Sequence, residues 1–418
     1  MTLKFRFSLI GFGIILFMFI TPVLVLYARG FQFDWHTHKI VKTGAIVIKT
    51  DPSGAEVYLS DKKQSDTTPD SIRFLLPGDY NLRIEKDGYQ PWAKRLTVRE
   101  QFVTKAAEDQ NLITLFFKDP KPEEPRAASQ ISLSKTGQEI FYFDGKQNAA
   151  SINTSNGSLT LQGNKADAKL PSVLPAAIFK WQNAAQFFEL LQSRGKWGLT
   201  DEQIGKVQEA ETTGAHSAAK IGPDLYSLDN TTPGLLAKSI TAFTLDGENI
   251  WYIQGSDLKR FDYSTNTSET INQIAPLAST ARIIRADNQI YAILDNSLYV
   301  LNDTFEKIYS PVSMASYDPV SKQMLFGNNN EILIYKPAQK NTVLIQRSSS
   351  VIGNPVLNAE TGFVFFRNQG KIKAVELDGR DHRNLYTIAD DLGNFAISPD
   401  GKTLYTFNDK QLKKYTIR

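Results

Sequence analysis

The 418-residue sequence predicts an all-β protein carried on one N-terminal membrane-spanning helix. Three observations predict this arrangement. Residues 7–28 carry no charge, apolar and polar side chains alternate from about residue 44, and a multi-strand unit recurs after residue 128. Alternation with a period of two is typical of half-buried strands, and a repeat of roughly 40 residues is typical of β-propeller blades.

The composition excludes several classes of site. Hydrophobic residues make up 41% and charged residues 22%, which is ordinary for a globular protein. The 47 Lys and Arg residues nearly balance the 44 Asp and Glu residues, and a net charge of +3 argues against a dedicated nucleic-acid binder. The chain has no cysteine, so disulfides, thiolate nucleophiles and cysteine-ligated metals are excluded.

The segment 7–28 is long enough to span a bilayer. As a helix it would extend ~33 Å at ~1.5 Å per residue, against a hydrocarbon core of ~30 Å. A cleaved signal peptide is the alternative, but its apolar region is usually only about 7–15 residues and no Ala-x-Ala cleavage site follows here. We therefore expect a retained transmembrane helix behind a cytoplasmic tail of residues 1–6.

The flanking charges leave the orientation open. Five basic residues lie close to the helix: Lys4 and Arg6 before it, and Arg29, Lys39 and Lys42 after it. Counted alone, they slightly favour an external N-terminus, yet long domains are translocated despite such charges. We expect the N-terminus inside and the body outside the cytoplasm, with the aromatics of residues 30–35 at the outer interface.

Residues 44–117 are typical of short strands separated by strong turns. Apolar and polar side chains alternate over 55–59 and 80–84. Four motifs follow one another in order: Pro52-Ser53-Gly54-Ala55, Thr68-Pro69, Leu76-Pro77-Gly78-Asp79-Tyr80 and Lys86-Asp87-Gly88-Tyr89-Gln90-Pro91. Together they resemble the PEGA domain, although Ser53 stands where the name-giving motif has Glu. The resemblance implies a small β-sandwich of the kind carried by bacterial and archaeal surface proteins, without catalytic residues.

The segment 118–127 contains Pro120, Pro122 and Pro125 among charged residues, and this composition predicts a semi-extended linker. Beyond it, polar turns lead into apolar strands that start at residues 250, 290, 324, 363 and 404, separated by 40, 34, 39 and 41 residues. This period predicts a β-propeller over 128–418 with about seven blades, six or eight remaining open. The last unit, Ser398–Tyr405, resembles the repeat of TolB-type, WD40-like propellers.

The earlier part of the array is less regular. Segments 138–143 and 186–191 are candidates for the same strand of the repeat, and we interpret 187–250 as one blade with a long insertion. The final unit has room for only about three strands, so a strand from the other end should close the ring. Residues 130–133 are favoured over 111–117, which we expect to complete the PEGA-like sheet.

The sequence offers no catalytic motif. It contains no Gly-x-Ser-x-Gly elbow, no His-Glu-x-x-His and no phosphate-binding loop. The residues considered for metal binding are His36, His38, His216, His382, Asp229, Asn230 and Asp262, and their spacing matches no compact metal site. We therefore predict no catalytic, cofactor-binding or metal-binding residues and no cofactor.

The leading hypothesis is a membrane-anchored binding or scaffolding protein that presents its propeller to a protein or a cell-envelope glycan. The alternative is a propeller enzyme, a lyase or glycan-acting hydrolase, with carboxylates such as Asp287, Asp318 and Asp400 at its axis. These three residues lie in repeat turns, where Asp is common for conformational reasons. A sensor is a third possibility, but a six-residue tail leaves little to carry a signal inward.

Overall fold

The computed structural model describes residues 3–35, 37–108, 112–133, 139–144, 148–154, 159–164, 199–204, 206–212, 216–229, 232–273, 278–390, 393–407 and 410–418. It divides into two compact units. The first comprises Met1–Lys118, Glu376–Asn384 and Arg418, and the second comprises Asp119–Val375 and Leu385–Ile417.

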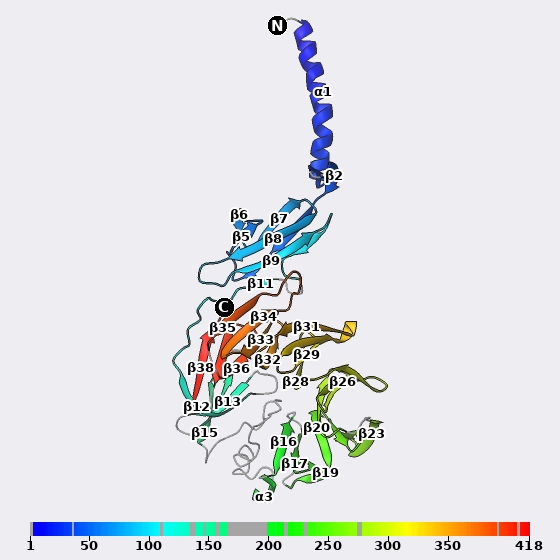
Figure 1. Cartoon of the computed structure of the whole chain (residues 1–418), viewed down its shortest axis with the longest axis vertical. Helices are drawn as coiled ribbons and strands as arrows, with labels where there is room; N and C mark the ends of the chain where they lie inside the picture. Colours follow the sequence, from blue (N-terminus) through cyan, green and yellow to red (C-terminus); the bar gives the residue numbers. More distant parts are fainter. Residues whose placement is uncertain are drawn as a thin grey trace. The chain divides into compact units, whose positions relative to one another are not determined.

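The first unit begins with helix α1 (Leu3–Ala28), followed by the hairpin of β1 (Phe31–Asp34) and β2 (Lys39–Lys42) (Figure 1). Within α1, Ile10–Ala28 is long and apolar enough to cross a membrane, and none of it is buried. The helix starts before residue 7, the predicted boundary, because the preceding Lys and Arg are good helix formers.

Three sheets follow in the first unit. Their strands, in spatial order, are β10 (Val103–Lys105), β3 (Gly44–Ile48) and β7 (Asp70–Leu75); β11 (Ile113–Thr114) and β4 (Thr50–Asp51); and β6 (Lys62–Thr67), β5 (Glu56–Leu59), β8 (Gly78–Glu85) and β9 (Trp92–Val98). Alternate residues of β3 and β9 are buried, as a period of two requires. The inward side chains of the sheets, among them Ile46, Val57 and Trp92, share one core. The predicted sandwich is therefore confirmed.

Later residues complete this sandwich. Strand β11 pairs in parallel with β4, and Tyr89 forms an antiparallel bridge with Phe117. These pairings confirm that the described part of segment 111–117 belongs to the PEGA-like sheets.

In its described residues, the second unit consists of antiparallel sheets in which strands adjacent in sequence pair with one another. Five are four-stranded: β16 (Val207–Thr212), β17 (Ser217–Ile221), β18 (Asp224–Ser227), β19 (Gly234–Ala237); β20 (Ile240–Asp246), β21 (Asn249–Gln254), β22 (Asp257–Asp262), β23 (Thr267–Gln273); β24 (Ala281–Ala286), β25 (Gln289–Leu294), β26 (Ser297–Leu301), β27 (Phe305–Tyr309); β28 (Met314–Asp318), β29 (Gln323–Gly327), β30 (Glu331–Lys336), β31 (Asn341–Arg347); β32 (Ile352–Asn358), β33 (Phe363–Asn368), β34 (Lys371–Glu376), β35 (Leu385–Ala389). The described part of this unit also contains the short helical segments α3 (Asp201–Ile204) and η1 (Pro337–Gln339).

These sheets are arranged as propeller blades. The first strands of neighbouring sheets contact one another, β16 with β20, β20 with β24, and β24 with β28. The strands predicted from the repeat are β21, β25, β29, β33 and β37 (Thr403–Phe407), and each is the second strand of its sheet. The predicted period therefore follows equivalent positions in successive blades, and the all-β prediction is confirmed.

One further sheet joins the two ends of the array. It contains β15 (Leu159–Asn164), β14 (Asn148–Asn153), β13 (Glu139–Asp144), β12 (Arg126–Leu133), β38 (Gln411–Thr416), β37 and β36 (Asn394–Ile397) in that order. Strand β12 pairs with β38 through Arg126 and Ala127 and with β13 over 128–133. Ring closure by a strand from the start of the array is confirmed, but the closing residues precede the predicted 130–133.

The predicted end of the linker was wrong. Residues 126 and 127 lie in strand β12 rather than in a linker, and within that segment Pro122 bridges Tyr415 while Glu123 donates its N–H to Lys414 O. Strands β16–β19 form one four-stranded sheet between 207 and 237, within the segment 187–250 that we interpreted as one blade with a long insertion. The predicted strand 186–191 lies outside the described residues, so the insertion stays a prediction.

Candidate functional site

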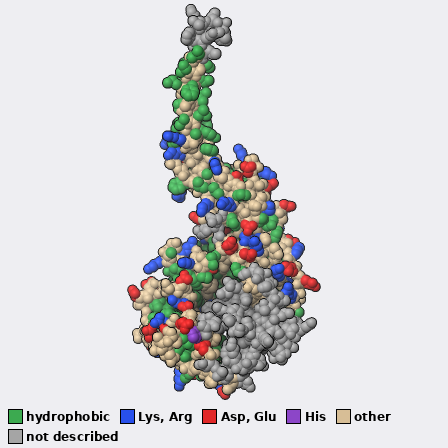
Figure 2. Space-filling model, turned by 180° about the vertical axis from the view of Figure 1, so that it is seen from behind, with side chains coloured by type: hydrophobic (Ala, Val, Ile, Leu, Met, Phe, Trp, Pro, Cys, Tyr) green, Lys and Arg blue, Asp and Glu red, His purple; other side chains and the backbone are tan. Residues whose placement is uncertain are grey.

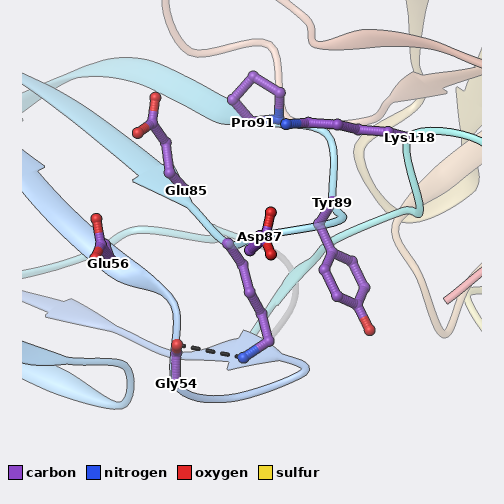
Figure 3. A pocket seen from close by; sticks show the side chains of 8 residues that line it. Gly54, Glu56, Glu85, Asp87, Tyr89, Pro91 and Lys118 are labelled. Atoms are coloured by element: carbon purple, nitrogen blue, oxygen red, sulfur yellow. Dashed lines mark hydrogen bonds between the residues drawn. The ribbon is translucent and has the colours of Figure 1, made fainter.

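A groove of about 530 Å³ opens at one end of the four-stranded sheet β6–β5–β8–β9 in the first unit (Figure 3). Charged residues from β5, the end of β8 and the following turn dominate its lining. The lining residues are Gly54, Glu56, Glu85, Lys86, Asp87, Tyr89, Pro91 and Lys118.

Two carboxylates face each other across the strands of this groove. Glu56 and Glu85 are directly opposite in the pairing of β5 with β8, a position where like charges destabilise a sheet. Separate cations offset the repulsion: Lys63 Nζ lies 2.6 Å from Glu56 Oε1, and Arg83 pairs with Glu85. The hydrogen bonds from Lys63 and Tyr58 hold the pKa of Glu56 below its usual value, so the carboxylate stays ionised.

The rest of the groove supplies donors and an aromatic face. Lys86 Nζ donates to Ser53 O at 2.9 Å and to Gly54 O at 3.3 Å, which restrains its side chain. The Tyr89 ring stacks on Phe117 with centroids 4.6 Å apart. Burial, with a smaller effect of Asp51, raises the pKa of Tyr89, so its hydroxyl remains a donor.

The lining has three carboxylates against two ammonium groups, and two of the carboxylates have cations of their own. The groove therefore presents many hydrogen-bonding atoms but little uncompensated charge. Such a surface suits a neutral ligand rich in hydroxyl groups better than a strongly charged one.

A buried ionic cluster lies elsewhere in the first unit. Lys94 Nζ, fully buried, is 2.9 Å from Glu376 Oε2 and 3.6 Å from Asp378 Oδ2. Trp92 Nε1 donates to Glu376 Oε1 at 2.9 Å. Burial opposes ionisation of Asp378, but hydrogen bonds from Arg380 outweigh it and lower its pKa. The cluster is a structural element of the sandwich, since its groups satisfy one another.

In the second unit, His216 lies between two carboxylates. Its Nδ1 is 2.8 Å from Asp229 Oδ2, its Nε2 is 2.8 Å from Glu248 Oε2, and its ring stacks on Tyr263 at 3.8 Å. Partial burial disfavours the charged imidazole, but the two carboxylates outweigh it and raise the pKa of His216. The contacts link the sheet β16–β19 to the sheet β20–β23.

The other sequence-selected residues do not converge. His38 packs its ring against Phe33, His382 Nδ1 contacts Asp381 Oδ2 at 2.8 Å, and Asp262 accepts the Ser264 N–H at 2.8 Å. His36 and Asn230 lie outside the described residues. Within the described ranges, no group of three or more His, Asp or Glu residues is placed to hold a metal ion.

The three carboxylates of the enzyme alternative bond within turns or to a neighbouring hydroxyl. Asp318 accepts the Ser321 N–H at 2.7 Å and Asp400 accepts the Lys402 N–H at 3.0 Å. Asp287 accepts from the Tyr317 hydroxyl at 2.8 Å. Each lies between the first and second strands of a different sheet or at the end of that first strand, in agreement with their interpretation as turn residues.

Comparison with known families bears on the sandwich that carries the groove. Residues 43–110 match the family model of the PEGA domain. This part of the chain is similar to the PEGA domain, and we refer to it by that name below. The groove is thus a feature of the PEGA domain and of the residues that directly follow it, since Lys118 lies beyond the matched range.

No curated protein sequence matches the chain. Among solved structures, a chain of the mitotic checkpoint complex matches with a TM-score of 0.41 and 12% identity, over 71% of this chain and 92% of the other. The extracellular domain of a putative hybrid two-component system from B. thetaiotaomicron matches with a TM-score of 0.39 and 13% identity, over 72% of this chain and 39% of the other.

Sequence reasoning missed both ionic clusters. Lys94 did carry a signal, because it occupies the inward face of a strand on which Trp92 and Leu96 are buried. A lysine at such a position requires a buried partner. No sequence signal pointed to the His216 cluster, since the partners of His216 come from separate loops of two blades.

Proposed function

We propose that this chain is a membrane-anchored binding protein that holds a PEGA domain and a β-propeller outside the cytoplasm. The anchor is α1, whose large apolar side chains from Ile10 to Tyr27 are exposed, a surface that only an apolar environment stabilises. The PEGA match supports the external location, because such domains belong to surface proteins.

The groove beside Tyr89 is the observation that carries the binding proposal. It combines ionised carboxylates, ammonium groups and a stacked aromatic ring with little net charge. Sugar hydroxyls donate and accept in closely spaced pairs, and carboxylates with aromatic faces match them. The proposed ligand is therefore a cell-envelope glycan, bound without chemical change.

Binding can be measured with the full chain in lipid nanodiscs against an array of cell-wall glycan fragments. We expect retention of at least one fragment, and we expect Glu85→Gln combined with Asp87→Asn to weaken it tenfold or more. Glu269→Gln is the matched control, since Glu269 is also an exposed carboxylate paired with an arginine, Arg260. Equal binding by the groove variant and the control, or no binding at all, would refute the glycan assignment.

The orientation has its own test. The native chain has no cysteine, so single cysteines introduced at exposed positions report their own accessibility. A membrane-impermeant maleimide should label Val320→Cys in intact spheroplasts. Labelling only after lysis would place the body in the cytoplasm and overturn the proposal.

A further inference from the structure

Large apolar side chains are exposed where α1 meets the PEGA domain. The hairpin of β1 and β2 presents Trp35 and Ile40, and the sandwich presents Phe74, Phe102 and Val103. Their exposed fractions are 78%, 58%, 41%, 65% and 61%, respectively. Single exposed apolar residues are common, but a group of five with two aromatics from the sandwich itself marks an interaction surface. We call these five residues the apolar base.

The topology explains why they gather. Strand β3 starts at Gly44, directly after the hairpin, and Gly44 pairs with Leu75 at the end of β7. On the other side of β3, Val103 at the start of β10 pairs with Ala45. Phe74, Phe102 and Val103 therefore occupy the same end of the sheet β10–β3–β7, the end from which the hairpin and helix depart.

Specific contacts tie this end to the helix. Tyr27 in the last turn of α1 stacks on Phe74 with ring centroids 5.2 Å apart. Thr43 donates its N–H to Gly30 O at 2.8 Å. The loop before β10 approaches Gly44 so closely that a Cβ there would lie 2.5 Å from Arg99 O. The apolar base thus continues the apolar surface of α1.

The charge around the apolar base is predominantly basic. Five cations accompany it: Arg29, Lys39, Lys42, Arg73 and Arg99. Two acidic residues, Asp34 and Glu100, lie among them. Figure 2 shows Lys and Arg side chains gathered where the helix α1 ends and the rest of the first unit begins. Basic residues next to a membrane span are attracted to anionic headgroups.

We propose that the apolar base inserts into the interface of the bilayer that α1 spans and that the surrounding cations contact anionic lipid headgroups. This inference rests on the proposed membrane anchoring. The PEGA domain is then seated on the lipid surface by two attachments, the helix and the base, rather than tethered by the helix alone. Amphipathic aromatics such as Trp35 favour this depth in a bilayer.

The test uses the full chain in vesicles of phosphatidylcholine and phosphatidylglycerol, with a nitroxide attached through Phe102→Cys. We expect the ratio of oxygen to nickel-chelate accessibility to be severalfold higher than for Val320→Cys. Val320 is the matched control because it is an apolar residue with 80% exposure in a turn of the second unit. In vesicles without phosphatidylglycerol, or with Arg73→Gln and Arg99→Gln added, the ratio should fall.

The outcomes separate this inference from the anchoring proposal. Alkaline carbonate extraction of the chain from the vesicles would defeat the anchoring itself. Retention of the chain with equal ratios at positions 102 and 320 would overturn the apolar base alone. If the nitroxide at position 102 were equally inaccessible to the nickel chelate in detergent and in lipid, it would be covered by protein and not by the bilayer. That result would also overturn the proposed insertion of the apolar base. If the ratio of oxygen to nickel-chelate accessibility at position 102 changed neither without phosphatidylglycerol nor with the arginine substitutions, the proposed headgroup contacts would be overturned.

Discussion

The ammonium group of Lys94 lies 2.9 Å from the carboxylate of Glu376, and both side chains are buried. The first comes from β9 of the sandwich, and the second begins the segment Glu376–Asn384, which belongs to the same compact unit. Arg380 adds to this attachment by donating to Lys105 O at 3.0 Å and Ala106 O at 2.9 Å. The sandwich therefore includes residues far from it in sequence.

Replacing the lysine should be costly. Lys94→Met leaves the carboxylates of Glu376 and Asp378 buried without it, and breaking a buried pair in this way costs about 3–5 kcal/mol. Chemical denaturation of the full chain, followed at the PEGA domain, measures the loss. Adding Glu376→Gln should recover part of the stability. Lys63→Ala, which removes an exposed pair, is the control and should cost much less stability.

The His216 cluster predicts a pH-dependent stability of the second unit. Its folded pKa lies above the unfolded value of about 6.5, so protonated His216 stabilises the fold fully below that pH. The contribution is lost as the pH rises through the folded pKa. The charged and titratable groups that contact the imidazole are Asp229, Glu248 and Tyr263.

Accordingly, His216→Gln should lower the melting temperature more at pH 6 than at pH 9. Thermal unfolding at both pH values measures the difference, and His382→Gln controls for the loss of a histidine that is mostly exposed. An equal loss at both pH values would mean that His216 acts through packing on Tyr263 and not through its charge.

Closure of the ring by β12 and β38 predicts cooperative loss of the second unit. Deleting residues 404–418 should abolish protease resistance throughout 128–403, because β12 and β36 then expose unpaired edges. Leu412→Ala, which only opens a cavity, should cost about 2–5 kcal/mol and keep a single transition. A truncated chain that melts like the full one would instead indicate nearly independent repeats.

Comparing alanine substitutions at Gly401 and Gly247 separates the effect of a packing clash on stability from the effect of backbone strain. Both have positive φ, +67° and +57°, so alanine costs about 1–2 kcal/mol at either position. Only at Gly401 would the new methyl group collide with Thr361 and crowd Asn358, while the space at Gly247 is open. Gly401→Ala should therefore lower the melting temperature more than Gly247→Ala. Equal losses would contradict this packing.

Patterns among neighbouring residues predicted the strands and turns, because these elements depend mainly on residues close in sequence. The strands near 250, 290, 324, 363 and 404 were found because each combines a polar turn with an apolar run. The PEGA sandwich was found because its turns require Gly and Pro at fixed positions. The groove was not predicted, because Glu56 and Glu85 become neighbours only when β5 pairs with β8.

The same limit explains the missed partners of Lys94. No local pattern links β9 to a segment that connects β34 and β35, since pairing over such a separation depends on the whole topology. The linker was misjudged for a related reason. Proline predicts semi-extended chain, but Pro122 still forms a bridge because a strand, β38, lies beside it.

The attachment of Glu376–Asn384 has a consequence for the order in which the protein matures. The strands of the PEGA domain can pair early during synthesis, but the carboxylates beside the ammonium group of Lys94 are absent until Glu376 and Asp378 have been synthesised. Until then the lysine must remain hydrated, and Trp92 beside it cannot become fully buried. The PEGA domain thus becomes fully packed only after the segment Glu376–Asn384, far from it in sequence, has been made.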